Sequence, residues 1–199
     1  SNRLGGNSLS DLLVFGRRAG EAAAARADSL GGSGGGTRPV VREDDIAAAQ
    51  ASALAPFEEP AGGGGENPYA IQQDLQQSMN DLVGIIRNAH ELQQSLQEIE
   101  RLKERAKHLT VEGHRQYNPG WHLAIDLRNM LIVSECIAKA ALAREESRGG
   151  HTRDDFPQTD PEVWGTKNLV CTLDATGTGV DLSEKPLPVM PDELKKYFD

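Results

Sequence analysis

Between residues 67 and 143 the apolar residues recur at spacings of three and four, and this pattern constrains the fold more than any other feature of the chain. The spacing predicts three amphipathic helices, over residues 68–87, 92–106 and 121–143. The third segment is apolar on most sides, so we expect it to be the central and most buried helix. Because the connections are short, the three helices are expected to pack as an up-down bundle.

Shorter elements are predicted on both sides of this bundle. A helix is expected to begin at about Ser8, where Ser8-Leu9-Ser10-Asp11 has the pattern of a capping box, and its apolar positions predict a broad buried face. Residues 167–173 predict a strand, onto which 180–182 is expected to pair back as a hairpin. The end of the chain, with Pro186, Pro188 and Pro191, is expected to be an extended tail. The predicted fold class is therefore mainly α, with a short C-terminal β segment.

Residues 30–65 differ in composition from the rest of the chain. The runs GGSGGG and GGGG flank a stretch rich in alanine and acidic residues, and Pro39, Pro56 and Pro60 interrupt any long element. Residues 44–54 have the composition of a short helix, although the flanking glycines leave its position poorly fixed. We interpret this region as a surface insertion without chemistry of its own.

Charge and hydropathy exclude two classes of partner. The net charge of −9 argues against a protein that grips phosphate backbones, so no nucleic acid is expected. No stretch of about 18 apolar residues exists, so no bilayer span is expected and any membrane association must come through another subunit.

Cys136 and Cys171 are isolated in the sequence and lack metal-ligand spacing, which favours buried thiols in a reducing compartment. Because the chain opens on a loop without an initiator Met, we expect Ser1 to lie inside a longer polypeptide.

Two polar segments stand out from the helical background. The first, Asn2 to Leu9, places Arg3 and two glycines before a helix amino terminus, an arrangement suited to an anion or a carbonyl group. Taken alone, two glycines before a capped helix are more often simple punctuation. The second, Arg144 to Pro157, is charge-dense, and in isolation such a stretch is usually a solvated turn with local ion pairs.

Together the two segments resemble a known family. The order NRLGGNSL, LLVFGRRAG, a helical bundle and then ESRGGHTRDDFP resembles the flavoprotein subunit of succinate dehydrogenase and fumarate reductase. The resemblance covers most of the chain, and the glycine-rich insertion is the main departure. It implies that 1–27 is the end of an FAD-binding domain, 28–66 the insertion, 67–148 a three-helix bundle like the C-terminal domain of that family, and 149–199 a C-terminal segment.

The resemblance also assigns site residues. It implies that Arg3 binds a carboxylate of the dicarboxylate substrate, for which the fork of a guanidinium is suited. It implies that the backbone of Ser8 and Leu9 lies against the pyrimidine side of FAD, where a helix amino terminus would stabilise negative charge on the reduced flavin. The family's catalytic arginine, substrate histidines, flavin-attached histidine and dinucleotide fingerprint are all expected upstream. No catalytic residue is therefore expected in this chain, which by itself should be inactive.

For Arg148, His151 and Arg153 the resemblance gives a recurring signature, which we interpret as a scaffold that ties the bundle to the flavin domain. No metal site is expected. His108 and His114 flank Glu112 without the spacing of a ligand set, and two lone cysteines cannot ligate an iron–sulfur cluster.

The implied reaction is the oxidation of succinate to fumarate, with electrons passing through FAD to an iron–sulfur subunit and quinone. A membrane-anchor subunit would hold the complex at the cytoplasmic side of the membrane, with this chain peripheral. Fumarate reductase, the same reaction reversed, is a close alternative because the sequence does not set the direction. L-aspartate oxidase, which shares weaker versions of both motifs, is a third. A non-catalytic helical interaction module is the alternative from another class, and it predicts that Arg3→Ala leaves function intact.

Overall fold

The computed structural model describes residues 5–30, 41–58 and 63–197. The chain divides into two compact units, Ser1–Ala53 and Leu54–Asp199. The first unit contains α1 (Asn7–Ser29) and nearly all of α2 (Glu43–Leu54), and neither helix has a buried residue. The hydrophobic core of the described residues lies entirely in the second unit.

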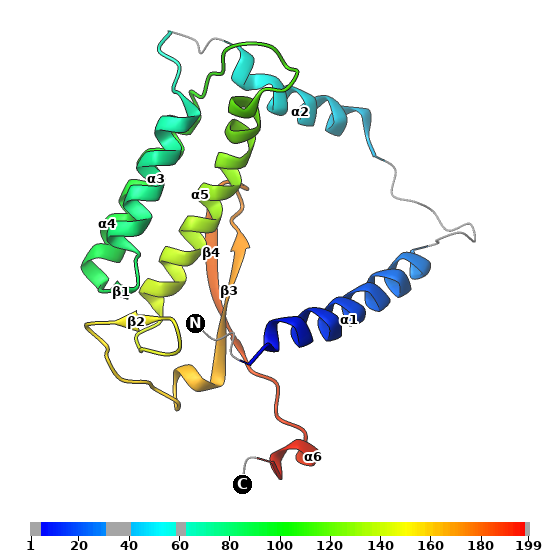
Figure 1. Ribbon diagram of the computed structural model, residues 1–199, viewed down its shortest axis with the longest axis vertical. Helices are drawn as coiled ribbons and strands as arrows, with labels where there is room; N and C mark the ends of the chain where they lie inside the picture. The colour runs from blue at the N-terminus through cyan, green and yellow to red at the C-terminus, as the bar shows by residue number, and fades with distance from the viewer. Residues whose placement is uncertain (1–4, 31–40, 59–62, 198–199) are drawn as a thin grey trace. The chain divides into compact units, whose positions relative to one another are not determined.

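Three antiparallel helices, α3 (Pro68–Leu82), α4 (Ala89–Ala106) and α5 (Pro119–Ala143), form the second unit's bundle (Figure 1). Their apolar stripes meet in a common core, in which the following side chains are at most 2% exposed: Ile71, Leu75, Leu92, Ile99, Leu102 and Leu127. The spacing of three and four therefore reflects real burial, and the predicted mainly α, up-down bundle is confirmed.

Each helix of the bundle begins at an asparagine. The side-chain oxygens of Asn67, Asn88 and Asn118 accept hydrogen bonds from the backbone amides of Tyr69, Glu91 and Trp121, at 2.9, 3.0 and 3.0 Å. These bonds satisfy amides that have no partner within the helix. In α3 and α5 a proline follows the asparagine, at a position where its missing N–H costs nothing. The local sequence therefore determines where each helix begins.

The first bundle helix is shorter than predicted. It ends at Leu82, not near Arg87, and residues 86–87 form the strand β1 (Ile86–Arg87). Gly84 lies so close to the helix that a side chain there would meet the Asn80 carbonyl oxygen at 2.8 Å. Arg87 then turns back, and its Nε donates to the carbonyl oxygens of Val83 and Gly84 at 3.2 and 2.8 Å. The arginine therefore caps the helix that it was expected to continue.

Helix α5 contributes more buried residues than α3 or α4, but it is not buried on all sides. Ile125, Val133 and Ile137 are 38%, 55% and 42% exposed. One side of the helix packs on α3 and α4, and another receives the C-terminal hairpin. Among the described residues the remaining side is open, but the expectation that this is the most buried helix of the bundle is confirmed.

Two small sheets complete the second unit. The strand β1 pairs in parallel with β2 (Thr152–Arg153), which joins the end of α3 to the loop after α5. The strands β3 (Lys167–Leu173) and β4 (Val180–Pro186) form an antiparallel hairpin, which confirms the predicted one and extends it to the pairing of Lys167 with Pro186. Pro186 is therefore the last residue of β4 and not the start of the tail. A proline is tolerated at a strand end, where its missing N–H removes no bond from the middle of the sheet. The tail contains a four-residue helix, α6 (Asp192–Lys195).

A buried carboxylate holds the hairpin on α5. Glu135 is 2% exposed and pairs with Lys103 of α4 and Lys139 of α5, each at 2.5 Å. Burial alone would raise the pKa of Glu135, but the hydrogen bonds from both lysines outweigh it and lower that pKa. The Val180 amide donates to Glu135 at 3.4 Å, and Lys139 donates to the Val180 carbonyl at 2.6 Å. Both backbone groups of the first residue of β4 are therefore held by α5.

The insertion is exposed only in part. Its predicted short helix is confirmed as α2, while the run GGSGGG, Pro39 and Pro60 lie outside the described residues. Pro56 is buried, its carbonyl accepts from Val111 N at 2.8 Å, and the Phe57 ring meets the Trp121 ring edge-on with centroids 5.3 Å apart. Gly65 packs so closely on Thr110 that no side chain fits there. The end of the insertion therefore belongs to the packed unit.

Candidate functional site

The first predicted site lies at the start of α1. Arg3 lies outside the described residues. Gly5 and Gly6 both have left-handed backbones, with φ of 60° and 78°, which side-chain-bearing residues rarely adopt. Nothing lies within 4 Å of a Cβ built on either glycine, so the approach to the first turn of the helix is open among the described residues.

The predicted capping box does not form. Gly6 is the N-cap, Asn7 is the first helical residue, and no side chain of the N-cap can bond to the helix. Ser8 is half-buried and Leu9 is 69% exposed, with its amide donating to the Gly6 carbonyl at 3.1 Å. A glycine turn replaces the serine cap because two consecutive left-handed residues already reverse the chain into the helix.

The expected buried face of α1 is also absent from the structure. Its apolar side chains are at least half exposed: Leu9, Leu12, Leu13, Val14 and Phe15 range from 53% to 76%. In the first unit no described residue of α1 or α2 is buried, so that unit has no core on which these side chains could pack.

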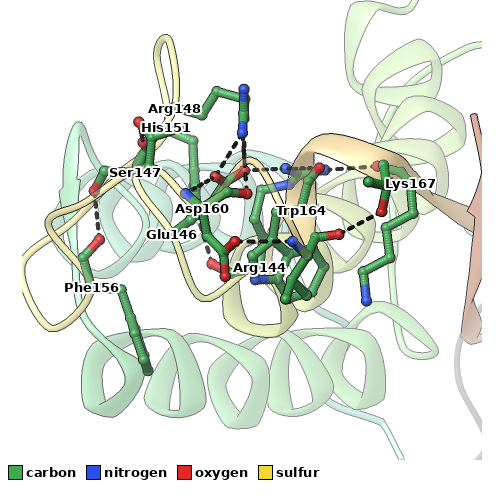
Figure 2. A network of polar contacts seen from close by, with 12 residues as sticks. Arg144, Glu146, Ser147, Arg148, His151, Phe156, Asp160, Trp164 and Lys167 are labelled. Carbon is green, nitrogen blue, oxygen red and sulfur yellow. Dashed lines mark hydrogen bonds and ion pairs between the residues drawn. The ribbon is translucent and has the colours of Figure 1, made fainter.

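The second site is built around a carboxylate that is fully buried. Glu146 accepts hydrogen bonds from Arg148 Nε at 2.8 Å, from Arg144 Nη1 at 2.5 Å and from the Asp160 amide at 2.8 Å (Figure 2). The bond from Arg148, helped by those from Asp160 and Arg144, lowers the pKa of Glu146 to about 2 against the opposing effect of burial. The buried negative charge is therefore compensated by two guanidinium groups.

This cluster reaches the first strand of the hairpin through an aromatic ring. Trp164 contacts two cations, with Arg144 Cζ 5.2 Å and Lys167 Nζ 4.4 Å from its ring centroid. Such cation–π contacts are attractive because the ring face carries negative charge density. Lys167, the first residue of β3, also pairs with Glu184 of β4 at 2.8 Å. The hairpin is thereby tied to the segment that leaves α5.

Arg153 joins two helix ends. Its Nη1 donates to the carbonyl oxygens of Ala141, Leu142 and Arg144 at 2.8, 3.0 and 3.3 Å, which caps the C-terminus of α5. Its other side-chain nitrogens bond both oxygens of Asp155, at 2.7 and 2.8 Å.

Asp155 completes the bridge, because it accepts from the Ala89 amide at the first residue of α4, at 2.9 Å. The hydrogen bonds from Arg153, with that from Ala89, lower the pKa of Asp155 to about 2. A cation therefore lies at one helix C-terminus and an anion at another's N-terminus, as the helix dipoles favour.

His151 is held between two arginines. Arg87 Nη1 lies 3.0 Å from His151 Nδ1, and His151 Nε2 lies 3.1 Å from the Arg144 carbonyl. An arginine can only donate, so Nδ1 is the acceptor and Nε2 carries the proton, which makes the ring neutral. Burial lowers the pKa of His151, and the neighbouring cations Arg87, Arg153 and Arg144 lower it further. The histidine therefore links the cap of α3 to the end of α5.

These contacts join the ends of α3, α4 and α5 to the start of β3, and we name the set the junction: Arg87, Arg144, Glu146, Arg148, His151, Arg153, Asp155, Asp160 and Trp164. Arg148, His151 and Arg153, singled out from the sequence, all belong to it. Within this chain they brace the fold.

Sequence reasoning missed the other members of the junction. Arg144 and Arg148 flank Glu146 at alternate positions, and this alternation of charge was the available signal for Glu146, since in an extended segment alternate side chains share a side. Arg87 carried no such signal.

A pocket of about 500 Å³ opens beside the junction. Arg87, Arg144 and His151 line one part of it, and the apolar Ile137, Leu169 and Val170 line another. The charged groups in this wall already bond to protein partners.

The described residues contain no group of three or more His, Cys, Asp or Glu side chains placed to hold a metal ion. Within the same residues no helix is both long and apolar enough to cross a bilayer.

Comparison with known proteins places these features in context. Residues 72–196 match the family model described as fumarate reductase flavoprotein C-term. The fumarate reductase flavoprotein subunit of Mycobacterium tuberculosis is 39% identical over 173 residues, which cover 85% of this chain and 29% of that protein.

Solved structures extend the likeness over the first unit as well. Mycobacterium smegmatis Sdh1, solved in complex with UQ1, matches 100% of this chain with 52% identity and a TM-score of 0.90. A quinol-fumarate reductase solved with menaquinol molecules matches 96% of the chain with 31% identity and a TM-score of 0.79. This chain spans about a third of the length of each of these two matched chains.

Proposed function

The chain belongs to the fumarate reductase flavoprotein C-terminal family, and from this premise we propose that it is the C-terminal part of a flavoprotein oxidoreductase that oxidises succinate to fumarate. The observation that most supports the proposal is the likeness to Sdh1, which extends over the whole chain, including the loop before α1. The relatives carry both succinate dehydrogenase and fumarate reductase names. We favour the succinate-oxidising direction because identity is higher to Sdh1 than to the named fumarate reductases.

The cofactor proposed for the whole protein is FAD, which supplies a hydride acceptor when bound. The residues present fit the edge of a flavin ring. Gly5 and Gly6 leave open space before α1, so a flat polar group can approach the backbone of Ser8 and Leu9. The positive end of the 23-residue helix dipole at this point favours negative charge on whatever lies there. In this proposal α1 therefore contributes electrostatic stabilisation, and no proton transfer.

Arg3 is proposed to bind one carboxylate of the dicarboxylate. Only Leu4 separates it from the glycine turn in the sequence, so a carboxylate held by it is expected near the same opening. A guanidinium can bind a carboxylate through two parallel hydrogen bonds and keeps its charge at any working pH. The bidentate contact fixes the orientation of the substrate, so that the carbon to be oxidised faces one side of the site.

The proposed partners are an iron–sulfur subunit, which receives the electrons, and a membrane-anchor subunit that passes them to quinone. With these partners the protein is peripheral at the cytoplasmic side of the membrane. The likeness to chains solved with a quinone or quinol supports such an assembly.

The test uses the full-length flavoprotein from which this segment comes, assembled with its partners. Arg3→Ala is expected to lower succinate turnover by about 100-fold or more, because a charge-assisted bidentate contact is lost. Arg3→Lys should recover only part of the activity, since it restores the charge and not the fork. The flavin absorption spectrum and the melting temperature should stay unchanged in both variants.

Arg101→Ala is the matched control. Arg101 lies on α4 in the packed second unit, its side chain is 53% exposed, and it pairs with Glu98 at 2.5 Å. Its removal should leave turnover intact. Normal turnover in Arg3→Ala would refute the assignment of Arg3. A full-length protein that binds no flavin would instead favour a non-catalytic helical module, and oxidation of L-aspartate in place of succinate would favour L-aspartate oxidase.

A further inference from the structure

The two cysteines, far apart in the sequence, meet where the C-terminal hairpin rests on α5. Cys136 lies on α5 and Cys171 on β3, 35 positions later, and the Cys171 sulfur is 4.0 Å from the Cys136 carbonyl oxygen. Both thiols are free and half-buried. The expectation of buried thiols is therefore corrected, since both are partly exposed.

Contacts that do not involve sulfur hold the pair together. Cys171 pairs with Leu182 of β4, two residues from Val180, and both backbone groups of Val180 are bound by Glu135 and Lys139 of α5. Glu135 is the neighbour of Cys136 in the helix. The hairpin is thus fixed against the turn of α5 that carries Cys136, so the two thiols are brought together without a covalent bond.

We propose that Cys136 and Cys171 form a reversible redox pair, which a hydroperoxide oxidises to an intrachain disulfide that fastens the hairpin to α5. The arrangement places the Cys171 sulfur against the backbone of Cys136, and such proximity of two cysteines on separate elements is the first requirement for a disulfide. The packed helix and the paired strand leave neither thiol free to seek another partner elsewhere in this unit.

The chemistry proceeds in two balanced steps. The Cys171 thiolate attacks the outer oxygen of the hydroperoxide, the O–O bond breaks, and the alcohol or water leaves after taking up a proton, which yields a sulfenic acid on Cys171. The Cys136 sulfur then attacks the Cys171 sulfur, the S–O bond breaks, and hydroxide leaves as water with the proton of the Cys136 thiol. Two electrons pass from the two thiols to the peroxide.

The roles of the two cysteines follow from their surroundings. Burial raises the pKa of Cys136, and the adjacent Cys171 thiol raises it further. Cys136 therefore remains protonated at neutral pH and is a poor first nucleophile, since the thiolate is the reactive form. It acts second, as the resolving thiol.

The disulfide would restrain the motion of the hairpin relative to α5. The chain between the two cysteines contains Arg144–Trp164, the part of the junction that follows α5. The disulfide would close this stretch into a covalent loop and remove the open states in which the hairpin leaves α5. The flavoprotein would then keep its junction closed under oxidising stress.

The experiment uses the full-length flavoprotein and hydrogen peroxide as the probe. After exposure, free thiols are blocked with an alkylating agent, and a non-reducing digest is analysed by mass spectrometry. We expect a peptide linking Cys136 to Cys171, which disappears on treatment with dithiothreitol. Backbone amides of 167–173 and 180–186 should exchange hydrogen about tenfold or more slowly in the oxidised protein, because opening of the hairpin is restrained.

Cys136→Ser and Cys171→Ser separate the two roles. Cys136→Ser should accumulate a sulfenic acid on Cys171, which a dimedone probe captures, whereas Cys171→Ser should leave Cys136 reduced. Neither residue belongs to the proposed substrate or flavin site, so succinate turnover should be unchanged in both variants. Recovery of both cysteines in the alkylated form from peroxide-treated wild type, or their separate oxidation without a linked peptide, would overturn the proposal.

Discussion

The helices α1 and α4 both carry apolar stripes, but the structure treats them in opposite ways. In α4, Leu92, Ile99 and Leu102 are completely buried against α3 and α5. In α1, Leu12 and Leu13 are 66% and 76% exposed. An amphipathic pattern therefore predicts that a helix has a face to bury, but it does not say whether the covering element lies in the same segment of chain. In the proposed whole protein, the rest of the FAD-binding domain covers α1.

The comparison is sharpest for leucine-to-alanine substitutions. Leu102→Ala is expected to lower the free energy of unfolding of this chain by about 3–5 kcal/mol, because it leaves a cavity in a closed core. Leu12→Ala should change it by less than about 0.5 kcal/mol, since its side chain is already in water. Urea titration of the helical signal of the chain measures both.

The full-length protein provides the decisive contrast. There Leu12→Ala should become destabilising by about 2 kcal/mol or more, because the side chain is then packed. An equally small effect in both forms would mean that α1 stays exposed in the whole protein, and its assignment to the FAD-binding domain would be wrong.

The bundle could be predicted from the sequence because the pattern that specifies each helix lies within the residues of that helix and its cap. Spacing gives the buried stripe of each helix, and Asn67, Asn88 and Asn118 mark the helix starts. The junction could not be predicted in the same way. Arg87 and His151 lie 64 positions apart, and no periodicity connects an arginine after one helix with a histidine after another. The resemblance of the motif ESRGGHTRDDFP indicated the right segment. Only the structure showed which groups its charged side chains contact.

A second prediction compares two arginines of that motif. Arg153 is 1% exposed and Arg148 has a 42% exposed side chain. Arg153→Met removes the cap of α5 and leaves Asp155 without its main partner, so it should cost about 3 kcal/mol of unfolding free energy. Arg148→Met should cost less than Arg153→Met, because Arg148 is itself partly exposed and Glu146 keeps its bonds from Arg144 and the Asp160 amide.

Equal losses for the two arginines would show that burial does not decide their contribution. Thermal and urea unfolding of the two variants, with wild type measured in parallel, show which substitution lowers the unfolding free energy more.

The third prediction concerns pH. The pKa of His151 is lower in the folded protein than its usual 6.5, so the unfolded chain binds the extra proton first as the pH falls. Stability from neutral His151 is therefore fully present above pH 6.5 and is lost as the pH falls through the folded value. The expected loss is smaller than that from Arg153→Met, since protonation removes one acceptor contact and adds repulsion with Arg87.

His151→Gln is the control for this titration, because glutamine can accept and donate hydrogen bonds without ionising in this range. The difference in unfolding free energy between wild type and the variant should narrow as the pH is lowered from 7.5 to 5. A difference independent of pH would show that His151 does not titrate with folding. Below about pH 4.5 both proteins should weaken together, because the unfolded chain binds protons at Glu146 and Asp155 before the folded protein does, in which their pKa values are about 2.

The smallest expected effect comes from the insertion, which contains the same kind of contrast within itself. Helix α2 has no buried residue, whereas Phe57 packs edge-on against Trp121 and lies 5.8 Å from the Arg115 guanidinium. Replacing residues 31–51 by a short glycine-serine linker should leave complex assembly and succinate turnover unchanged in the full-length protein, because every described residue that is removed is exposed. Phe57→Ala, a single substitution, should lower the unfolding free energy by about 1–2 kcal/mol, since an aromatic pair and its partly buried area are lost. If the deletion abolishes assembly while Phe57→Ala does not, the exposed part of the insertion binds a partner. The exposed surface of α2 would then be an interface in the whole protein, as is proposed for the exposed face of α1.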